Sequence, residues 1–130
     1  MIRAIEAPIS AGELIDKITI LEVKVERLID RSKIDNAQAE LDLLHARRTR
    51  AIPESPELAR LTAELAAVNR RIWDLEDTIR DCERQRDFGV NFVAVARSIY
   101  RANDERAVIK RRINFALGSE LVEEKSYAAY

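Results

Sequence analysis

The sequence has few of the residues that cross-link, break or turn a chain: one cysteine, three glycines and three prolines among 130 residues. A lone cysteine, Cys82, cannot form an internal disulfide, so a disulfide-stabilised fold is excluded. Too few turn formers are present for an all-β sandwich with its many hairpins. The single histidine, His45, excludes a di-iron bundle site within one chain, because that site takes a histidine from each of two helices.

Long apolar runs and an excess of one charge are missing as well. Lysine and arginine number 22 and the acidic residues 23, so the net charge of −1 gives no general attraction to nucleic acid or to an anionic membrane. The longest apolar stretches, such as Phe92–Ala96, fall far short of the roughly 20 residues that span a bilayer. Residues 1–10 do not resemble a signal peptide. We therefore expect a cytoplasmic chain without a nucleic-acid or membrane partner.

The sequence is instead rich in apolar residues at helical spacing. The strongest stripe steps by three and four residues without a polar exception and consists of Leu58, Leu61, Leu65, Val68, Ile72, Leu75, Ile79 and Cys82. Similar stripes precede and follow it. We expect four helices, over residues 11–30, 33–51, 56–86 and 90–117, with an extended N-terminal arm over 1–9 and a C-terminal tail over 119–130.

Local signals support these boundaries. Ser10 and Glu13 have the spacing of a capping box at the first helix start, and Ser55 followed by Pro56 predicts the third start. Gly118 is typical of a helix end. Because the connections are short, consecutive helices should be antiparallel. The sequence predicts an all-α fold: one domain over 1–130, an elongated bundle in which the two long helices form a hairpin and the two shorter ones pack along it.

Polar residues interrupt or flank the apolar stripes near the middle of the long helices. Asn69 and Asn103 each need a hydrogen-bond partner there. A helical face that carries polar and aromatic groups, together with the only tryptophan, gives our candidate binding residues: Trp73, Tyr100, Asn103, Arg106 and Lys110. An internal hydrogen-bond layer explains the same residues without a ligand.

Other polar clusters are open to two interpretations. Arg47, Arg48 and Arg50, beside the proline-rich turn, are a candidate anion patch. Asp74 and Asp77 lie opposite the apolar stripe, so we expect them to face water rather than to bind Mg²⁺. We predict no catalytic residue, no cofactor and no metal site.

The chain ends carry apolar side chains without helical periodicity. Ile2 and Ile5 lie in the arm, and Tyr127 and Tyr130 lie in an otherwise charged tail. Exposed apolar groups of this kind are a liability unless something covers them. We expect both ends to pack on the bundle or on a partner subunit, with Tyr127 and Tyr130 as interaction anchors.

Several segments together resemble a small bacterial family of unknown function. They are PISAGELIDKITILEVKVERL, AVNRRIWDLEDTIRD, ARSIYRANDERAVIKRRIN and the ending LVEEKSYAAY, which span nearly the whole chain. The resemblance implies a helical single-domain protein and no particular activity.

The sequence favours a non-enzymatic protein-interaction or scaffold module that self-associates as a homodimer and has a possible further protein partner. The alternative is a small all-helical enzyme or binding protein for an anionic metabolite, with arginines as clamps. Arginines that converge on a concave pocket would favour the alternative, and arginines spread over the exterior would favour the interaction module.

Overall fold

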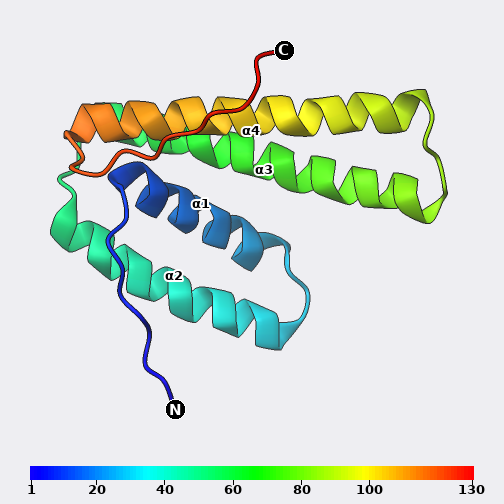
Figure 1. Ribbon diagram of the computed structural model, residues 1–130. Helices are drawn as coiled ribbons and strands as arrows, with labels where there is room; N and C mark the ends of the chain where they lie inside the picture. The colour runs from blue at the N-terminus through cyan, green and yellow to red at the C-terminus, as the bar shows by residue number, and fades with distance from the viewer.

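The computed structural model describes residues 1–130 and contains four helices and no strand: α1 (Ala11–Arg27), α2 (Arg31–Ala51), α3 (Pro56–Arg84) and α4 (Val90–Leu117). In Figure 1, α3 and α4 form a long antiparallel hairpin, α1 runs along it, and α2 lies outside α1. The predicted all-α, elongated antiparallel bundle is confirmed. No helix combines the length and apolar character that a membrane span requires.

The predicted capping residues set three of the helix boundaries. Ser10 Oγ accepts a hydrogen bond from the backbone N–H of Glu13 at 3.1 Å, and Ser55 Oγ accepts one from Leu58 at 3.0 Å. These bonds satisfy N–H groups that lack a partner within the helix. Gly118 ends α4 in the left-handed region, with φ of 60°. The starts at 11 and 56 and the fourth helix over 90–117 are therefore confirmed.

Three other boundaries differ from the prediction. The first helix ends at Arg27 rather than at 30, so Ile29 leaves the apolar stripe and is 95% exposed. Asp30 caps α2 with its side chain, which lets that helix begin two residues earlier than predicted. The third helix ends at Arg84 because the chain turns through Arg86, whose φ is +53°.

The core lies mainly between α1 and the α3–α4 hairpin. Its fully buried side chains include Ile15 and Ile18 of α1, Leu65 of α3 and Ile113 of α4. The backbone of α2 approaches α1 only, and α2 adds few buried residues to the core. The prediction that both short helices pack along the hairpin is thus right for α1 and wrong for α2.

The cover that α1 provides ends partway along the hairpin. At 1.5 Å per residue, the 17 residues of α1 reach about 26 Å, whereas the 29 residues of α3 reach about 43 Å. Leu58, Leu61, Leu65 and Val68 are at most 3% exposed. Beyond them Cys82 and Val95 stay buried, but five larger apolar side chains are only half-buried. We call these residues the distal seam: Ile72, Leu75, Ile79, Phe92 and Ile99.

Candidate functional site

The N-terminus of α1 lies unusually close to the C-terminal half of α4. The backbone N–H of Gly12 donates a hydrogen bond of 2.7 Å to Asn114 Oδ1. A Cβ atom at position 12 would lie 2.4 Å from the carbonyl oxygen of Lys110. Only glycine fits this contact, which brings the first turn of α1 against the polar side chains of α4.

A buried lysine lies beside this contact. Lys110, which is 8% exposed, donates hydrogen bonds to Glu13 (2.6 Å) and to Glu123 of the C-terminal tail (3.0 Å), and its Nζ is 3.6 Å from Asp16. Burial alone lowers the pKa of Lys110, but the two hydrogen bonds and the charges of Asp16 and Glu13 together outweigh it and raise the pKa. The same bond lowers the pKa of Glu123. Lys110 is thus charged and fully engaged by carboxylates.

A chain of side-chain hydrogen bonds continues from Asp16 across the three core helices. Asn69 Nδ2 on α3 donates to Asp16 Oδ1 at 2.9 Å and to Thr19 Oγ1 at 2.8 Å. Asn69 Oδ1 accepts from Arg106 Nη1 at 3.2 Å, and Arg106 Nη2 donates to Asn103 Oδ1 at 2.6 Å. Each buried amide therefore has a partner, as buried polar groups require.

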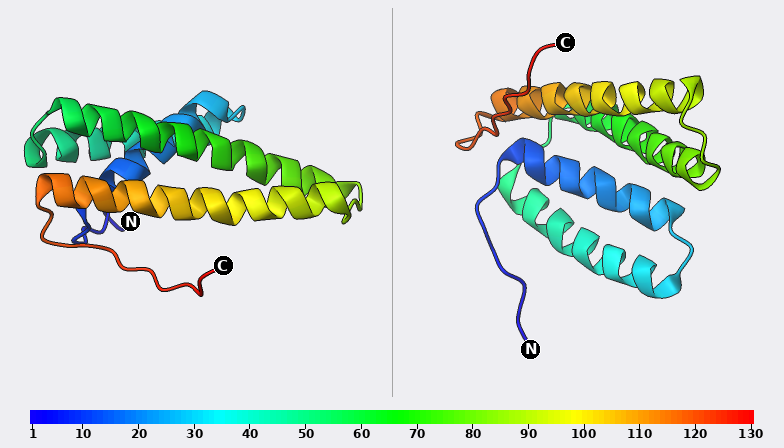
Figure 2. Two further views of the ribbon diagram at one scale, coloured as in Figure 1. Left: turned by 90° about the horizontal axis from the view of Figure 1, so that it is seen from above. Right: turned by 45° about the vertical axis from the view of Figure 1, so that its right-hand side comes forward.

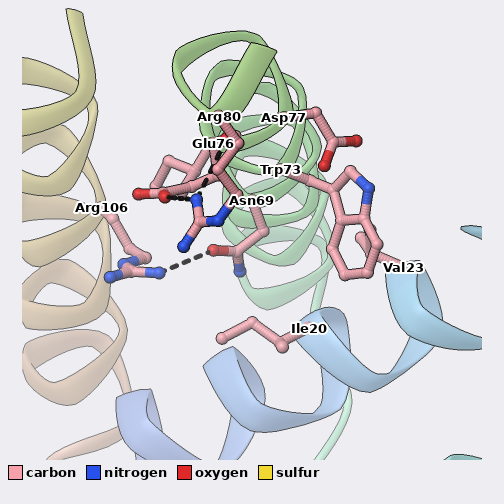
Figure 3. A pocket seen from close by; sticks show the side chains of 9 residues that line it. Ile20, Val23, Asn69, Trp73, Glu76, Asp77, Arg80 and Arg106 are labelled. Atoms are coloured by element: carbon pink, nitrogen blue, oxygen red, sulfur yellow. Dashed lines mark hydrogen bonds and ion pairs between the residues drawn. The ribbon is translucent and has the colours of Figure 1, made fainter. Parts of the chain in front are cut away.

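A groove of about 490 Å³ lies where α1 diverges from the hairpin, a divergence that Figure 2 shows. Figure 3 shows Asn69 at its centre, Arg106 on one side and Trp73 with Val23 on the other. Its lining residues come from three helices: Ile20, Val23, Asn69, Ile72, Trp73, Glu76, Asp77, Arg80 and Arg106. The groove combines an apolar wall with the end of the hydrogen-bonded chain.

A second groove, of about 740 Å³, lies between α4 and the C-terminal tail. The tail runs back along α4 in Figure 1 and contributes Tyr127 and Tyr130 to the lining. The Tyr130 ring packs edge-on against Tyr100, with 5.2 Å between centroids, and its hydroxyl donates to Asp104 at 2.6 Å. That bond raises the pKa of Tyr130.

The structure brings the predicted binding residues into two overlapping groups. Arg106 lines both grooves: Trp73 shares the first with it, and Tyr100 and Asn103 share the second. Lys110 lies apart from both, enclosed by carboxylates. The polar layer foreseen at Asn69 and Asn103 is present, joined by Arg106.

The three arginines of the candidate anion patch lie on α2 and differ in exposure: the Arg48 side chain is 15% exposed, and its Nε is buried without a hydrogen-bond partner. Arg47 pairs with Glu6 of the N-terminal arm, and Arg48 lies 3.6 Å from Glu54. Arg50 is exposed and has no ion-pair partner. None of the three lines the larger grooves, so they do not converge on a pocket.

The anchors expected in the tail are not buried within the chain. Tyr127 is 79% exposed and Tyr130 is 77% exposed, and Ile2 and Ile5 are also exposed. The tail is held instead by Glu123 on Lys110 and by the contacts of Tyr130. Tyr127 therefore does not pack within one chain, and its expected role as an anchor toward a partner subunit stays a prediction.

Several residues of the site escaped the sequence reasoning. Asp16, Thr19 and Asn114 are buried, and all three bond across helices or to a neighbouring helical backbone. One signal was available: Asp16 and Thr19 lie three apart, next to Ile15 and Ile18 on the apolar stripe of the first helix. Nothing in the sequence indicated that Glu123 accepts a hydrogen bond from Lys110, because the tail has no periodic pattern.

Reactive chemistry has little support in this arrangement. The thiol of Cys82 is buried and accepts a hydrogen bond from Asn91 at 3.5 Å. His45 lies on the surface, 3.5 Å from Glu22. No group of three or more His, Cys, Asp or Glu side chains is arranged so that it could hold a metal ion. The site is a set of polar contacts that join three helices and the tail.

Comparisons with known proteins give one match. No curated protein and no solved structure was found that matches the chain. Residues 5–130 match the model of a family of unknown function, DUF6165, and the chain belongs to that family.

Proposed function

We propose that this protein is a non-enzymatic interaction module that self-associates as a homodimer through the distal seam. The observation that carries the proposal is the change in burial along α3. Leu65 and Val68, which α1 covers, are at most 3% exposed, whereas Ile72 and Ile79 of the same stripe are only half-buried. Cys82 and Val95 are buried at the distal end, but the larger apolar side chains of the distal seam lack the third helix that covers the proximal end.

Charge complementarity makes a second copy of the chain the best-matched cover. Residues 72–84 of α3 carry five carboxylates and only two arginines, whereas residues 90–101 of α4 carry two arginines and no carboxylate. A two-fold axis that places α3 of one chain against α4 of the other therefore pairs opposite charges twice. The product is a four-helix bundle built from two hairpin ends.

The enzymatic alternative finds less support. Arg47, Arg48 and Arg50 of α2 line none of the larger grooves, and Arg101 is exposed on α4. Lys110 is already engaged by three carboxylates. This distribution fits the interaction module better than a clamp of converging cations around a reacting anion.

The test is a matched pair of substitutions. Ile99→Glu places a charge in the distal seam of α4, opposite the acidic α3 of the partner. Ile34→Glu is the control: it makes the same change at a half-buried isoleucine of α2, away from the seam. We expect Ile99→Glu to weaken the dimer at least tenfold in sedimentation equilibrium, and Ile34→Glu to leave the dissociation constant within about twofold.

Circular dichroism shows whether each variant keeps its helices. A folded Ile99→Glu chain that dimerises as tightly as the unchanged chain would contradict the proposal. Equal weakening by both substitutions would also contradict it, because the effect would then not depend on the seam.

A further inference from the structure

Arg106 is a partly buried cation of α4 whose charge no carboxylate balances. No carboxylate oxygen lies within 4.0 Å of its guanidinium, and its two side-chain partners, Asn69 and Asn103, are neutral amides. Lys110, one turn further along α4, has three carboxylates around it. The two cations therefore differ in kind: Lys110 holds the helices together, and Arg106 keeps an unneutralised charge.

The two amides also fix the orientation of the guanidinium. Asn69 accepts from Nη1 and Asn103 accepts from Nη2, which leaves three of the five N–H donors of Arg106 without a side-chain partner. Asn69 is itself held by Asp16 and Thr19, so it cannot turn without breaking two further hydrogen bonds. A guanidinium held in this way is preorganised for a planar anion such as a carboxylate.

The groove beside Arg106 supplies an apolar surface for the rest of a ligand. Ile20 and Val23 of α1 and Ile72 and Trp73 of α3 line it, and Figure 3 places Trp73 and Arg106 on opposite sides of Asn69. The groove shares only Ile72 with the distal seam. Apolar walls with a few fixed polar groups are typical of small-molecule sites.

The acidic residues of the lining restrict where a negative charge can lie. Glu76 is paired with Arg80. Asp77 lies at the Trp73 end of the groove in Figure 3. The hydrogen bond to Asp74 is the main cause of the raised pKa of Arg27, and the charge of Asp77 adds to it. An anionic group is thus repelled from the Trp73 end and attracted to the Arg106 end, which sets the direction of a bound ligand.

We propose that this groove binds a small monocarboxylate with an aromatic or apolar body, its carboxylate on Arg106 and its body against Trp73. The site goes beyond the proposed self-association and does not depend on it. Arg106 acts here through binding alone, and no reaction is implied.

Trp73 is the only tryptophan, so its fluorescence reports directly on the groove. The probe is phenylacetate, and phenylacetamide is its neutral counterpart with the same ring. We expect phenylacetate to change the emission saturably and phenylacetamide to bind at least tenfold more weakly. Arg106→Gln should weaken phenylacetate binding at least tenfold, whereas Arg112→Gln, at an exposed arginine of α4, should leave it within twofold.

A second variant keeps the test decisive if Arg106→Gln does not fold. Ile20→Phe fills the apolar wall and leaves the bonds of Arg106 to Asn69 and Asn103 in place, and it should weaken binding by a similar factor. Equal binding of the acid and the amide would overturn the proposal. So would an unchanged emission at saturating phenylacetate, or equal losses from Arg106→Gln and Arg112→Gln.

Discussion

Replacing Gly12 with alanine tests the contact on which the polar site is built. Within a helix this change normally stabilises a protein by up to about 1 kcal/mol, because alanine has the higher helix propensity. Here the added Cβ would lie 2.4 Å from the Lys110 carbonyl oxygen and 3.0 Å from Asn114 Oδ1. One of these neighbours is backbone, so α1 must move away from α4.

The expected loss follows from two effects. Overpacking a close contact costs about 1–3 kcal/mol. Losing the hydrogen bond from Gly12 to Asn114 costs about 1 kcal/mol more. After subtracting the helix-propensity gain, we expect a net destabilisation of about 2 kcal/mol. With an unfolding entropy of about 2.1 cal/mol/K per residue, this corresponds to a Tm lower by about 7 °C for a chain of 130 residues.

The assay is thermal unfolding followed by circular dichroism, with Gly89→Ala as the matched control. A Cβ at Gly89 meets only the Asp87 side chain, at 3.5 Å, which is an ordinary contact. Gly89→Ala should therefore leave Tm nearly unchanged. A Gly12→Ala protein as stable as the unchanged chain, or more stable, would refute the reasoning, because propensity would then outweigh the contact.

Two further predictions concern the lysine cluster. In urea unfolding, Lys110→Met should lower the free energy of unfolding by about 2–3 kcal/mol, because it leaves Glu13 and buried Asp16 without their cation. The control Lys17→Met, at an exposed lysine, should change the free energy of unfolding by no more than about 0.5 kcal/mol. Equal losses from the two changes would argue against a special role of Lys110. The lowered pKa of Glu123 means that its stabilising effect is present above its ordinary pKa of 4.5 and is lost as the pH falls through the lowered value. Urea unfolding between about pH 3 and pH 7 should show a weaker loss of stability in acid for Glu123→Gln than for the unchanged chain, and identical pH profiles would rule this out.

Helical periodicity predicted the four helices because the residues that a helix buries recur every three or four positions along the chain. The stripe from Leu58 to Cys82 and the caps at Ser10 and Ser55 are readable within a few residues, and they set most boundaries. Asp30 was not predicted as the α2 cap. Both Asp30 and Ser32 are residue types that favour an N-cap, and residue type alone does not decide between two candidates so close in sequence.

The polar site was predictable only where a polar residue interrupts a stripe. Asn69, Asn103 and Arg106 stood out for that reason, and the structure joins them. The partners of Lys110 could not be foreseen, since Glu13 and Glu123 reach it from segments 97 and 13 residues away. Such pairings depend on how α1 crosses α4 and on the path of an aperiodic tail.

The most direct test of the central claim is the mass of the unchanged chain in solution by light scattering. One chain weighs 14.9 kDa. At tens of micromolar the proposed seam-to-seam dimer predicts a mass of about twice that value, falling toward the single-chain mass on dilution. A mass of one chain at high micromolar concentration would contradict self-association through the distal seam.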